Sequence, residues 1–171
     1  MQPTLHLLMG LPGAGKTTLA KTLQAITHAA RLSSDDYRLI IYPAPTFSQK
    51  EHDNLYALLD HTAEHLLAAD YDVIYDANLN RKHHRQEKYD MAHKQNAKVI
   101  LWWVQTPRIL AKERRISEQI HTLLPAGETP DKMFERIAQI LEEPQSDEHF
   151  IAVDGRSITP QKIKALLESN Q

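Results

Sequence analysis

Apolar and polar positions follow two different periods along the chain. Short apolar runs, rich in leucine, isoleucine and valine, are followed by longer stretches in which apolar residues recur at helical spacing. The first pattern is typical of buried strands and the second of amphipathic helices. The predicted strands are residues 5–9, 30–33, 72–75, 99–104 and 150–153, and the predicted helices are residues 16–29, 48–69, 81–96, 107–123, 131–141 and a last one beginning at Thr159-Pro160.

Strands and helices that alternate in this order form βαβ units, which close into a parallel sheet with helices on both faces. We therefore expect one α/β domain over residues 1–171, a three-layer α/β/α sandwich with about five mostly parallel strands. No linker, internal repeat or low-complexity segment divides the chain. In such folds ligands bind at the carboxyl ends of the strands, so the chemistry is expected in the loops that follow them.

The loop after the first predicted strand matches the phosphate-binding pattern G-x-x-x-x-G-K-[ST] in full and opens a predicted helix. Its residues are Gly10, Leu11, Pro12, Gly13, Ala14, Gly15, Lys16 and Thr17. The glycines let backbone N–H groups turn toward phosphate oxygens, and the helix N-terminus adds positive potential. Lys16 is expected to reach the β- and γ-phosphates, the Thr17 hydroxyl to bind Mg²⁺, and Thr18 to contact the α-phosphate. The sequence thus predicts a P-loop fold that binds ATP with Mg²⁺.

Composition and charge narrow the class of protein further. The hydrophobic fraction of 42% and the charged fraction of 25% are those of an ordinary globular protein. The absence of cysteine excludes disulfides, thiolate metal sites and a cysteine nucleophile, and favours a reducing cytoplasm. The start of the chain lacks a signal-peptide pattern, and its apolar run is too short to span a bilayer. A net charge of −2 gives no global basic footprint for long nucleic acids.

Several classes of phosphate-loop protein are disfavoured by what the sequence lacks. It contains neither the D-x-x-G switch nor the N-K-x-D motif of GTPases, and it has no adjacent glycines of a transporter ATPase signature. The carboxylate Asp76, at the end of the third predicted strand, is followed by Ala77 and not by a glutamate that could activate water. Kinases remain, because they position a substrate hydroxyl in place of water.

A kinase needs a group that orients or deprotonates the acceptor hydroxyl. The segment 33–38 follows the second predicted strand, at the same edge of the sheet as the phosphate loop. Asp35 can accept a proton from a hydroxyl in line with the γ-phosphate, and Arg38 can hold the acceptor or its phosphate. Spacing alone equally allows Asp35 and Asp36 to be a helix cap or a solvated turn.

Three blocks of the sequence together resemble the kinase domain of 5′-hydroxyl polynucleotide kinases, and also a broad set of small bacterial P-loop kinases that includes zeta-toxin-like proteins. The blocks are Gly10–Thr17, Asp35-Asp36-Tyr37-Arg38, and Asp76-Ala77-Asn78-Leu79-Asn80. The resemblance covers nearly the whole chain. The Asp-Asp-Tyr-Arg block, at this distance from a phosphate loop, is the specific part of it.

The resemblance implies a role for each matching residue. Asp35 is expected to be the general base and Arg38 to bind the acceptor. Asp76 and Asn78 are expected to line the active site, where Asp76 either holds Mg²⁺ through water or only orients the residues of the phosphate loop. Arg85, on the following helix, matches a substrate-binding arginine of many relatives.

The resemblance also implies a helical lid at about residues 108–130. Arg114 matches the first arginine of the lid motif A-x-x-R-N-x-x-R. Arg115 stands where the motif has asparagine, and Glu118 stands where it has the second arginine. We expect Arg115 to supply the missing charge to the nucleotide phosphates.

The predicted function is therefore ATP-dependent transfer of the γ-phosphate to a substrate hydroxyl. The acceptor is either the 5′-hydroxyl of single-stranded DNA or RNA or a small-molecule alcohol. Two rival functions stay open: a nucleotide-binding regulator that uses ATP only as a switch, and a plain ATPase, which Ala77 disfavours.

Overall fold

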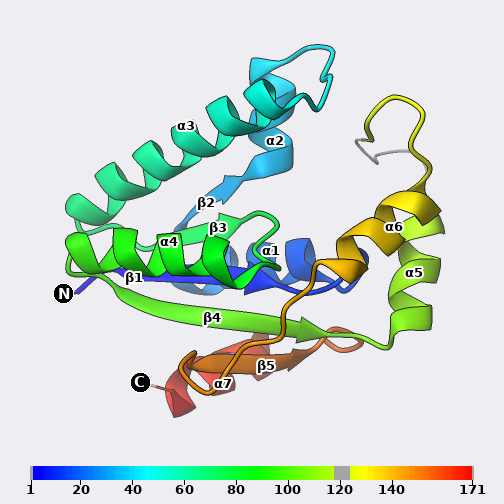
Figure 1. Cartoon of the computed structure of the whole chain (residues 1–171). Coiled ribbons are helices and arrows are strands. Elements are labelled where there is room, and N and C mark those ends of the chain that lie inside the picture. Colours follow the sequence, from blue (N-terminus) through cyan, green and yellow to red (C-terminus); the bar gives the residue numbers. More distant parts are fainter. Residues whose placement is uncertain (1, 118–123, 171) are drawn as a thin grey trace.

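The computed structural model describes residues 2–117 and 124–170, and these form a central sheet flanked by helices (Figure 1). The five strands are parallel and lie in the order β2-β3-β1-β4-β5. Their bounds are Thr4–Met9 for β1, Ala30–Ser33 for β2, Val73–Asp76 for β3, Lys98–Gln105 for β4 and Phe150–Asp154 for β5. The parallel sheet predicted from the sequence is thereby confirmed.

Seven helices connect the strands or follow them in the part of the chain that the structure describes. They are α1 (Lys16–Thr27), α2 (Ser34–Ile41), α3 (Gln49–Ala68), α4 (Lys82–Lys94), α5 (Arg108–Ser117), α6 (Pro130–Gln139) and α7 (Pro160–Ser169). None of these described helices is both long enough and apolar enough to span a membrane.

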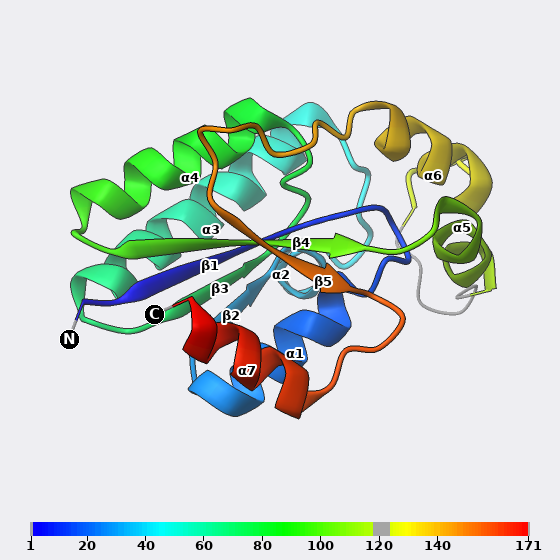
Figure 2. The same ribbon diagram turned by 90° about the horizontal axis from the view of Figure 1, so that it is seen from below.

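The helices form two layers, one on each face of the sheet. Figure 2 shows α1 and α7 side by side on one face, with α3 and α4 on the other. Side chains of β1 alternate between the layers: Leu5 and Leu7 pack with residues of α3 and α4, whereas Leu8 packs with residues of α1 and α7. The three-layer α/β/α sandwich is therefore as the apolar pattern predicts.

Two features differ from the sequence-based expectation. The segment after β2 is a helix, α2, because the Ser33 hydroxyl accepts a hydrogen bond from the Asp36 N–H (3.3 Å) and the first-turn carboxylates favour a helix N-terminus. Of the helix predicted for residues 107–123, the described residues contain α5, Arg108–Ser117. Residues 118–123, including Glu118, lie outside the described residues.

Candidate active site

A cavity of about 760 Å³ lies at the carboxyl ends of the strands. Its walls come from six parts of the chain: the phosphate loop, the start of α2, Phe47 in the α2–α3 connection, the end of β3, the α5–α6 region and residues 155–159. The volume is within the range of small-molecule sites. Phosphate-loop and candidate acceptor residues, which are far apart in the sequence, are thus brought into one cavity.

The phosphate loop has the backbone that its glycines make possible. Gly10, Gly13 and Gly15 have φ angles of +145°, +73° and +110°, a region that other residues rarely adopt. A Cβ on Gly13 would lie 2.1 Å from the Ala111 carbonyl oxygen of α5. Glycine is therefore required both for the turn and for the close approach of the loop to α5.

Lys16 folds back over the phosphate loop. Its Nζ donates hydrogen bonds to the carbonyl oxygens of Gly10 (2.8 Å) and Leu11 (3.0 Å). Thr17 and Thr18 follow it in the first turn of α1, where both are exposed and line the cavity. Ammonium and hydroxyl groups therefore face the same space.

Two side chains, from the segments that follow β3 and β4, hold the loop in place, and a glycine after β5 lets the chain pass close to it. The Asn80 amide forms two hydrogen bonds with the backbone of Gly10, accepting from its N–H (3.0 Å) and donating to its carbonyl (3.1 Å). The Thr106 hydroxyl donates to the Ala14 carbonyl (2.8 Å), and a Cβ on Gly155 would lie 2.1 Å from that same oxygen. Asn80 was not expected to have this role, although its place in the Asp76–Asn80 block marks it.

Asp35 lies in the first turn of α2 and lines the cavity together with Lys16 and Thr17. Asp35 is exposed to solvent, yet enough protein lies around its carboxyl to reduce the hydration of the charged form. This burial raises the pKa of the Asp35 carboxyl, the nearby Arg115 opposes the shift, and the Asp76 carboxylate adds to it. Asp36 instead pairs with Arg31 at 2.9 Å and does not line the cavity.

Asp76 is 8% exposed, and its carboxylate is held by Arg31. Its Oδ2 accepts hydrogen bonds from Arg31 Nε (2.9 Å) and Nη2 (2.6 Å). Arg31 was not singled out in the sequence, because it lies within a strand that precedes Asp76 by more than one element. Its guanidinium bridges the ends of β2 and β3 and fixes Asp76 beside the phosphate loop.

The side chains fit a hydrated Mg²⁺. Thr17 and Asp76 line the same cavity, and both hydrogen bonds from Arg31 to the Asp76 carboxylate are accepted by Oδ2. Mg²⁺ is usually held by one or two side chains, water and substrate phosphates. Within residues 2–117 and 124–170 no cluster of three or more histidines and carboxylates with the spacing of a metal site is found.

Arg38 does not line the cavity. It is 6% exposed, its guanidinium lies over the Phe47 ring (4.8 Å to the centroid), and its Nη1 is 4.0 Å from Glu51 Oε1. Phe47, which has a positive φ of 56°, lines the cavity in its place. The structure therefore does not place Arg38 on the cavity wall, where an acceptor-binding residue was expected.

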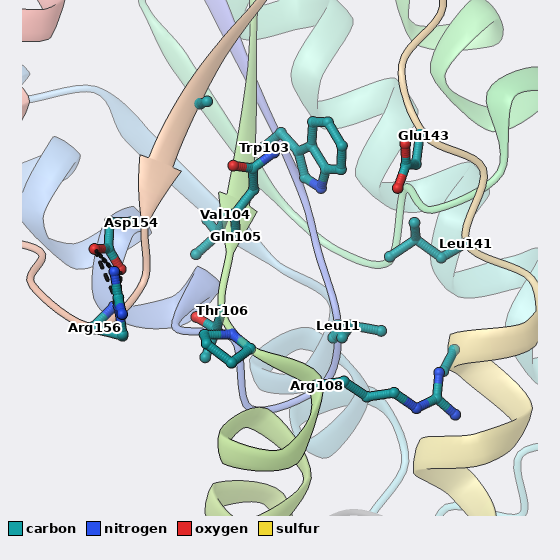
Figure 3. A pocket seen from close by; sticks show the side chains of 13 residues that line it. Leu11, Trp103, Val104, Gln105, Thr106, Arg108, Leu141, Glu143, Asp154 and Arg156 are labelled. Atoms are coloured by element: carbon teal, nitrogen blue, oxygen red, sulfur yellow. Dashed lines mark hydrogen bonds and ion pairs between the residues drawn. The ribbon is translucent and has the colours of Figure 1, made fainter.

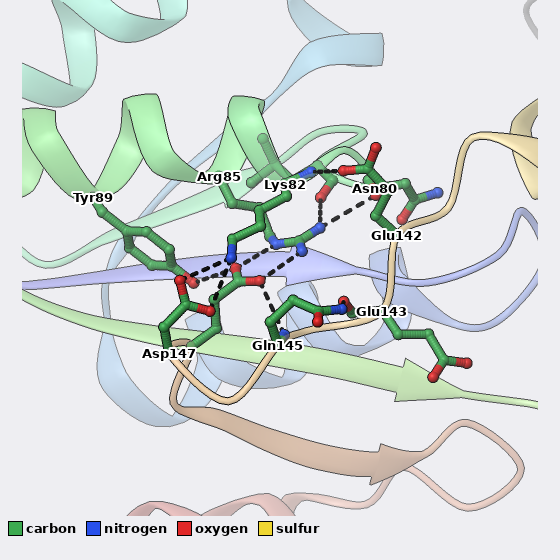
Figure 4. Close-up of polar contacts among 10 residues, drawn as sticks. Asn80, Lys82, Arg85, Tyr89, Glu142, Glu143, Gln145 and Asp147 are labelled. Carbon is green, nitrogen blue, oxygen red and sulfur yellow. Dashed lines mark hydrogen bonds and ion pairs between the residues drawn. The ribbon is translucent and has the colours of Figure 1, made fainter.

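Arg85 is also absent from the cavity wall, contrary to the expected contact with substrate. It is fully buried, and its Nε and Nη2 donate to the two Glu148 carboxylate oxygens at 2.7 and 2.8 Å. Nη1 donates to the carbonyls of Leu79 and Asn80 (Figure 4). The guanidinium therefore fastens the segment after β3 to the segment before β5, and it supports the anchor of the phosphate loop.

Several arginines contribute positive charge to the cavity. Arg114 and Arg115 line it from α5, and the Arg114 Nη1 donates to the Gly155 carbonyl (2.9 Å). Arg136 of α6 and Arg156, which follows β5, line it as well and were not singled out in the sequence. Asn78 also lines the cavity, two residues after Asp76.

A second cavity, of about 850 Å³, lies between the ends of β4 and β5 and the end of α6 (Figure 3). Its lining includes apolar side chains such as Trp103 and Leu141, and Leu11 is its one contribution from the phosphate loop. Although it is larger, it contains neither Lys16 nor Asp35. We therefore assign the candidate active site to the smaller cavity.

Comparisons with known proteins agree with this fold. The chain is similar to a candidate kinase from Chloroflexus aurantiacus (18% identity, all of both chains, TM-score 0.78). It is similar to Kti12 of Chaetomium thermophilum, solved with ADP-AlF3 (20% identity, 96% of each chain, TM-score 0.74). It also matches the Pnkp1/Rnl/Hen1 RNA repair complex (21% identity, 81% of this chain and 44% of that chain, TM-score 0.66).

At these identities the likeness shows the fold, and comparison with curated proteins gives no match. A family described as AAA domain matches residues 5–144. This span contains the phosphate loop, α2, the end of β3, α5 and α6, and it agrees with the resemblance to small P-loop kinases. The chain belongs to this AAA domain family and has the fold of the small P-loop kinases.

Proposed function

We propose that this protein is an ATP-dependent kinase that transfers the γ-phosphate to a substrate hydroxyl. The observation that carries the proposal is the position of Asp35, which shares one cavity with Lys16 and Thr17 and has a raised pKa. A general base is most effective when its pKa approaches the working pH. Ala77, next to Asp76, supplies no carboxylate for activating water.

The nucleotide phosphates would lie on the backbone N–H groups of the loop. Lys16 would exchange its two carbonyl partners for the β- and γ-phosphates, and Thr18 would face the α-phosphate. Thr17, with Asp76 through water, would hold Mg²⁺. When bound, Mg²⁺ supplies positive charge to the phosphate oxygens.

In the transfer step, Asp35 takes the proton of the acceptor hydroxyl as its oxygen forms a bond to the γ-phosphorus. The bond between that phosphorus and the β–γ bridging oxygen breaks, and ADP leaves. Negative charge on the transferring group is met by Lys16, Arg114 and Arg115. Asn78 and Phe47 line the side of the cavity on which the acceptor would lie.

We further propose that residues 1–171 act as one domain whose lid is formed by α5 and α6. The two helices are joined by Lys112, which pairs with Asp131 (2.7 Å) and Glu135 (2.8 Å). We propose that these two ion pairs make α5 and α6 move as one body. The expected lid at residues 108–130 would thus extend through α6.

A polynucleotide 5′-hydroxyl is the first acceptor to test, because the chain resembles polynucleotide kinases in three blocks and shares its fold with a chain of an RNA repair complex. The environment of Arg38 favours a second candidate, a small uncharged alcohol. Glu51 lies 4.0 Å from the Arg38 guanidinium and compensates its charge, which weakens any attraction for an acceptor phosphate. A sugar kinase also shares the fold.

The deciding experiment is a transfer screen with γ-labelled ATP and Mg²⁺ over 5′-hydroxyl oligonucleotides, nucleosides and sugars. We expect label on one acceptor class and none with Lys16→Ala. For a single-stranded polynucleotide, the logarithm of the affinity should fall with the logarithm of salt concentration with a slope of about −0.7 per phosphate contacted. A neutral alcohol should show almost no slope. Hydrolysis of ATP with no labelled acceptor in any class would instead favour an ATPase or a nucleotide-dependent regulator.

A further inference from the structure

Helix α6 presents one cation to the candidate active site. Met133, Arg136 and Ile137 line the cavity, and their spacing places them on one face of the helix. The two flanking side chains are apolar, so Arg136 is the charged group of this wall. It lies in the same cavity as Lys16, although no sequence pattern marks it.

Arg136 is held by a neighbouring carboxylate. Its Nε and Nη2 donate to the two Glu128 oxygens at 2.7 and 2.8 Å, which is the paired geometry that guanidinium forms with carboxylate or phosphate. This fork lowers the pKa of Glu128. The Arg136 side chain is 54% exposed, whereas that of Glu128 is 16% exposed, so solvent reaches the pair from the side of the arginine. A phosphate offers the same two-oxygen geometry and could therefore compete with Glu128 for the guanidinium.

Two other arginines of the cavity are bound to groups near the end of β5. Arg114 donates to the Gly155 carbonyl, and Arg156 donates to both carboxylate oxygens of Asp154. The partner of Arg136, Glu128, instead lies just before α6. Because Lys112 joins α5 to α6, Arg136 would travel with Arg114 when the lid moves.

Resting on the proposed kinase function, we infer that Arg136 is a further catalytic residue. On binding of ATP it leaves Glu128 and donates its fork to oxygens of the transferring phosphate. Glu128 holds the arginine extended until the phosphate competes for it. The interaction strengthens as charge develops on the phosphate, so Arg136 acts on turnover more than on nucleotide affinity.

The test compares Arg136→Ala with Lys132→Ala, a matched loss of one positive charge on α6 at an exposed position that does not line the cavity. ADP formation with Mg²⁺ is measured with the acceptor found in the screen and with water alone, and affinity for AMPPNP is measured by calorimetry. We expect Arg136→Ala to lower kcat by roughly 10²-fold or more, with AMPPNP affinity changed less than about fivefold. Arg136→Lys should be intermediate, because an ammonium cannot bind two oxygens as a planar fork.

Glu128→Gln distinguishes a catalytic role of Arg136 from a structural role of the Arg136–Glu128 ion pair. This variant removes the ion pair by changing the carboxylate and leaves Arg136 in place, and we expect tighter AMPPNP binding and no loss of kcat. Equal losses of kcat in Arg136→Ala and Glu128→Gln would overturn the inference, as would wild-type kcat in Arg136→Ala, or a rise in acceptor KM with kcat unchanged. Lys16→Ala distinguishes failure of this inference from failure of the proposed function. Full turnover in Lys16→Ala would refute the kinase function itself. If Lys16→Ala loses turnover while Arg136→Ala keeps it, only the role of Arg136 is refuted.

Discussion

At the scale of single residues, Asp35 and Asp36 are neighbours in sequence but lie in different environments. Asp35 lines the cavity, and burial raises the pKa of its carboxyl. Asp36 is paired with Arg31 outside it. A shift of one residue along the first turn of α2 therefore decides whether the carboxylate faces the cavity, as in Asp35, or forms an ion pair with Arg31, as in Asp36.

Asp35→Asn should lower phosphate transfer by roughly 10²–10⁴-fold and leave ATP affinity nearly unchanged, because an amide cannot act as the base. Since the raised pKa means that the carboxylate is lost as pH falls, wild-type kcat/KM should decrease toward acid pH, and the variant should lack this decrease. Transfer rates from pH 5 to 8 provide the measurement. If Asp36→Asn abolishes transfer while Asp35→Asn has only a mild effect, the general base is Asp36 and not Asp35.

At the scale of elements, the five strands and the longer helices could be predicted because their apolar periods are unbroken. Helix α2 could not, because Ser33-Ser34-Asp35-Asp36 reads equally as a turn, and its apolar residues Leu39 and Ile40 are exposed. The hydroxyl cap at Ser33 decides between the two. Local sequence supplied the cap residue but not the packing that makes a short helix form.

The candidate site shows the same division. The phosphate loop and Asp35 were predictable, since each depends on residues close together in sequence. Arg85 was expected to contact substrate but binds Glu148, 63 residues away, and the pairing of Arg31 with Asp76 spans 45 residues. Long-range partners of this kind depend on the closure of the sheet, and a single sequence does not display them.

Arg85→Met should destabilise the protein by about 3–5 kcal/mol, because it leaves the Glu148 carboxylate buried without its partner. The Arg85 guanidinium is what holds the pKa of Glu148 below its ordinary value against the effect of burial. Urea denaturation gives the free energy of unfolding. The double variant with Glu148→Leu should recover much of the loss, and a double variant as unstable as Arg85→Met would contradict this account.

At the scale of the whole molecule, the centre of the sheet contains a titratable group. His6 of β1 is 2% exposed, and its Nδ1 accepts a hydrogen bond from Trp102 Nε1 of β4 at 3.1 Å. Burial lowers the pKa of His6 to about 4. The neutral imidazole is therefore part of the packing between the two central strands.

Below its unfolded pKa of about 6.5, His6 binds a proton in the unfolded state but not in the folded state, so stability should decline as pH falls. Between pH 6.5 and 4 this group alone should remove about 3 kcal/mol from the free energy of unfolding. Chemical denaturation at several pH values, compared with His6→Gln, isolates the contribution. The variant should be less stable near pH 7 yet lose less stability toward acid; parallel curves would exclude His6 as the cause.

The fastening of the phosphate loop by Asn80 and Thr106 has a kinetic consequence. A loop anchored by these two side chains does not have to search for its shape when a nucleotide arrives, so the encounter itself sets the rate of capture. Nucleotides too short to draw in α6, such as ADP, should associate in a single phase whose rate constant rises linearly with concentration. A second, concentration-independent phase should appear only with the triphosphate, when the lid helices close behind it.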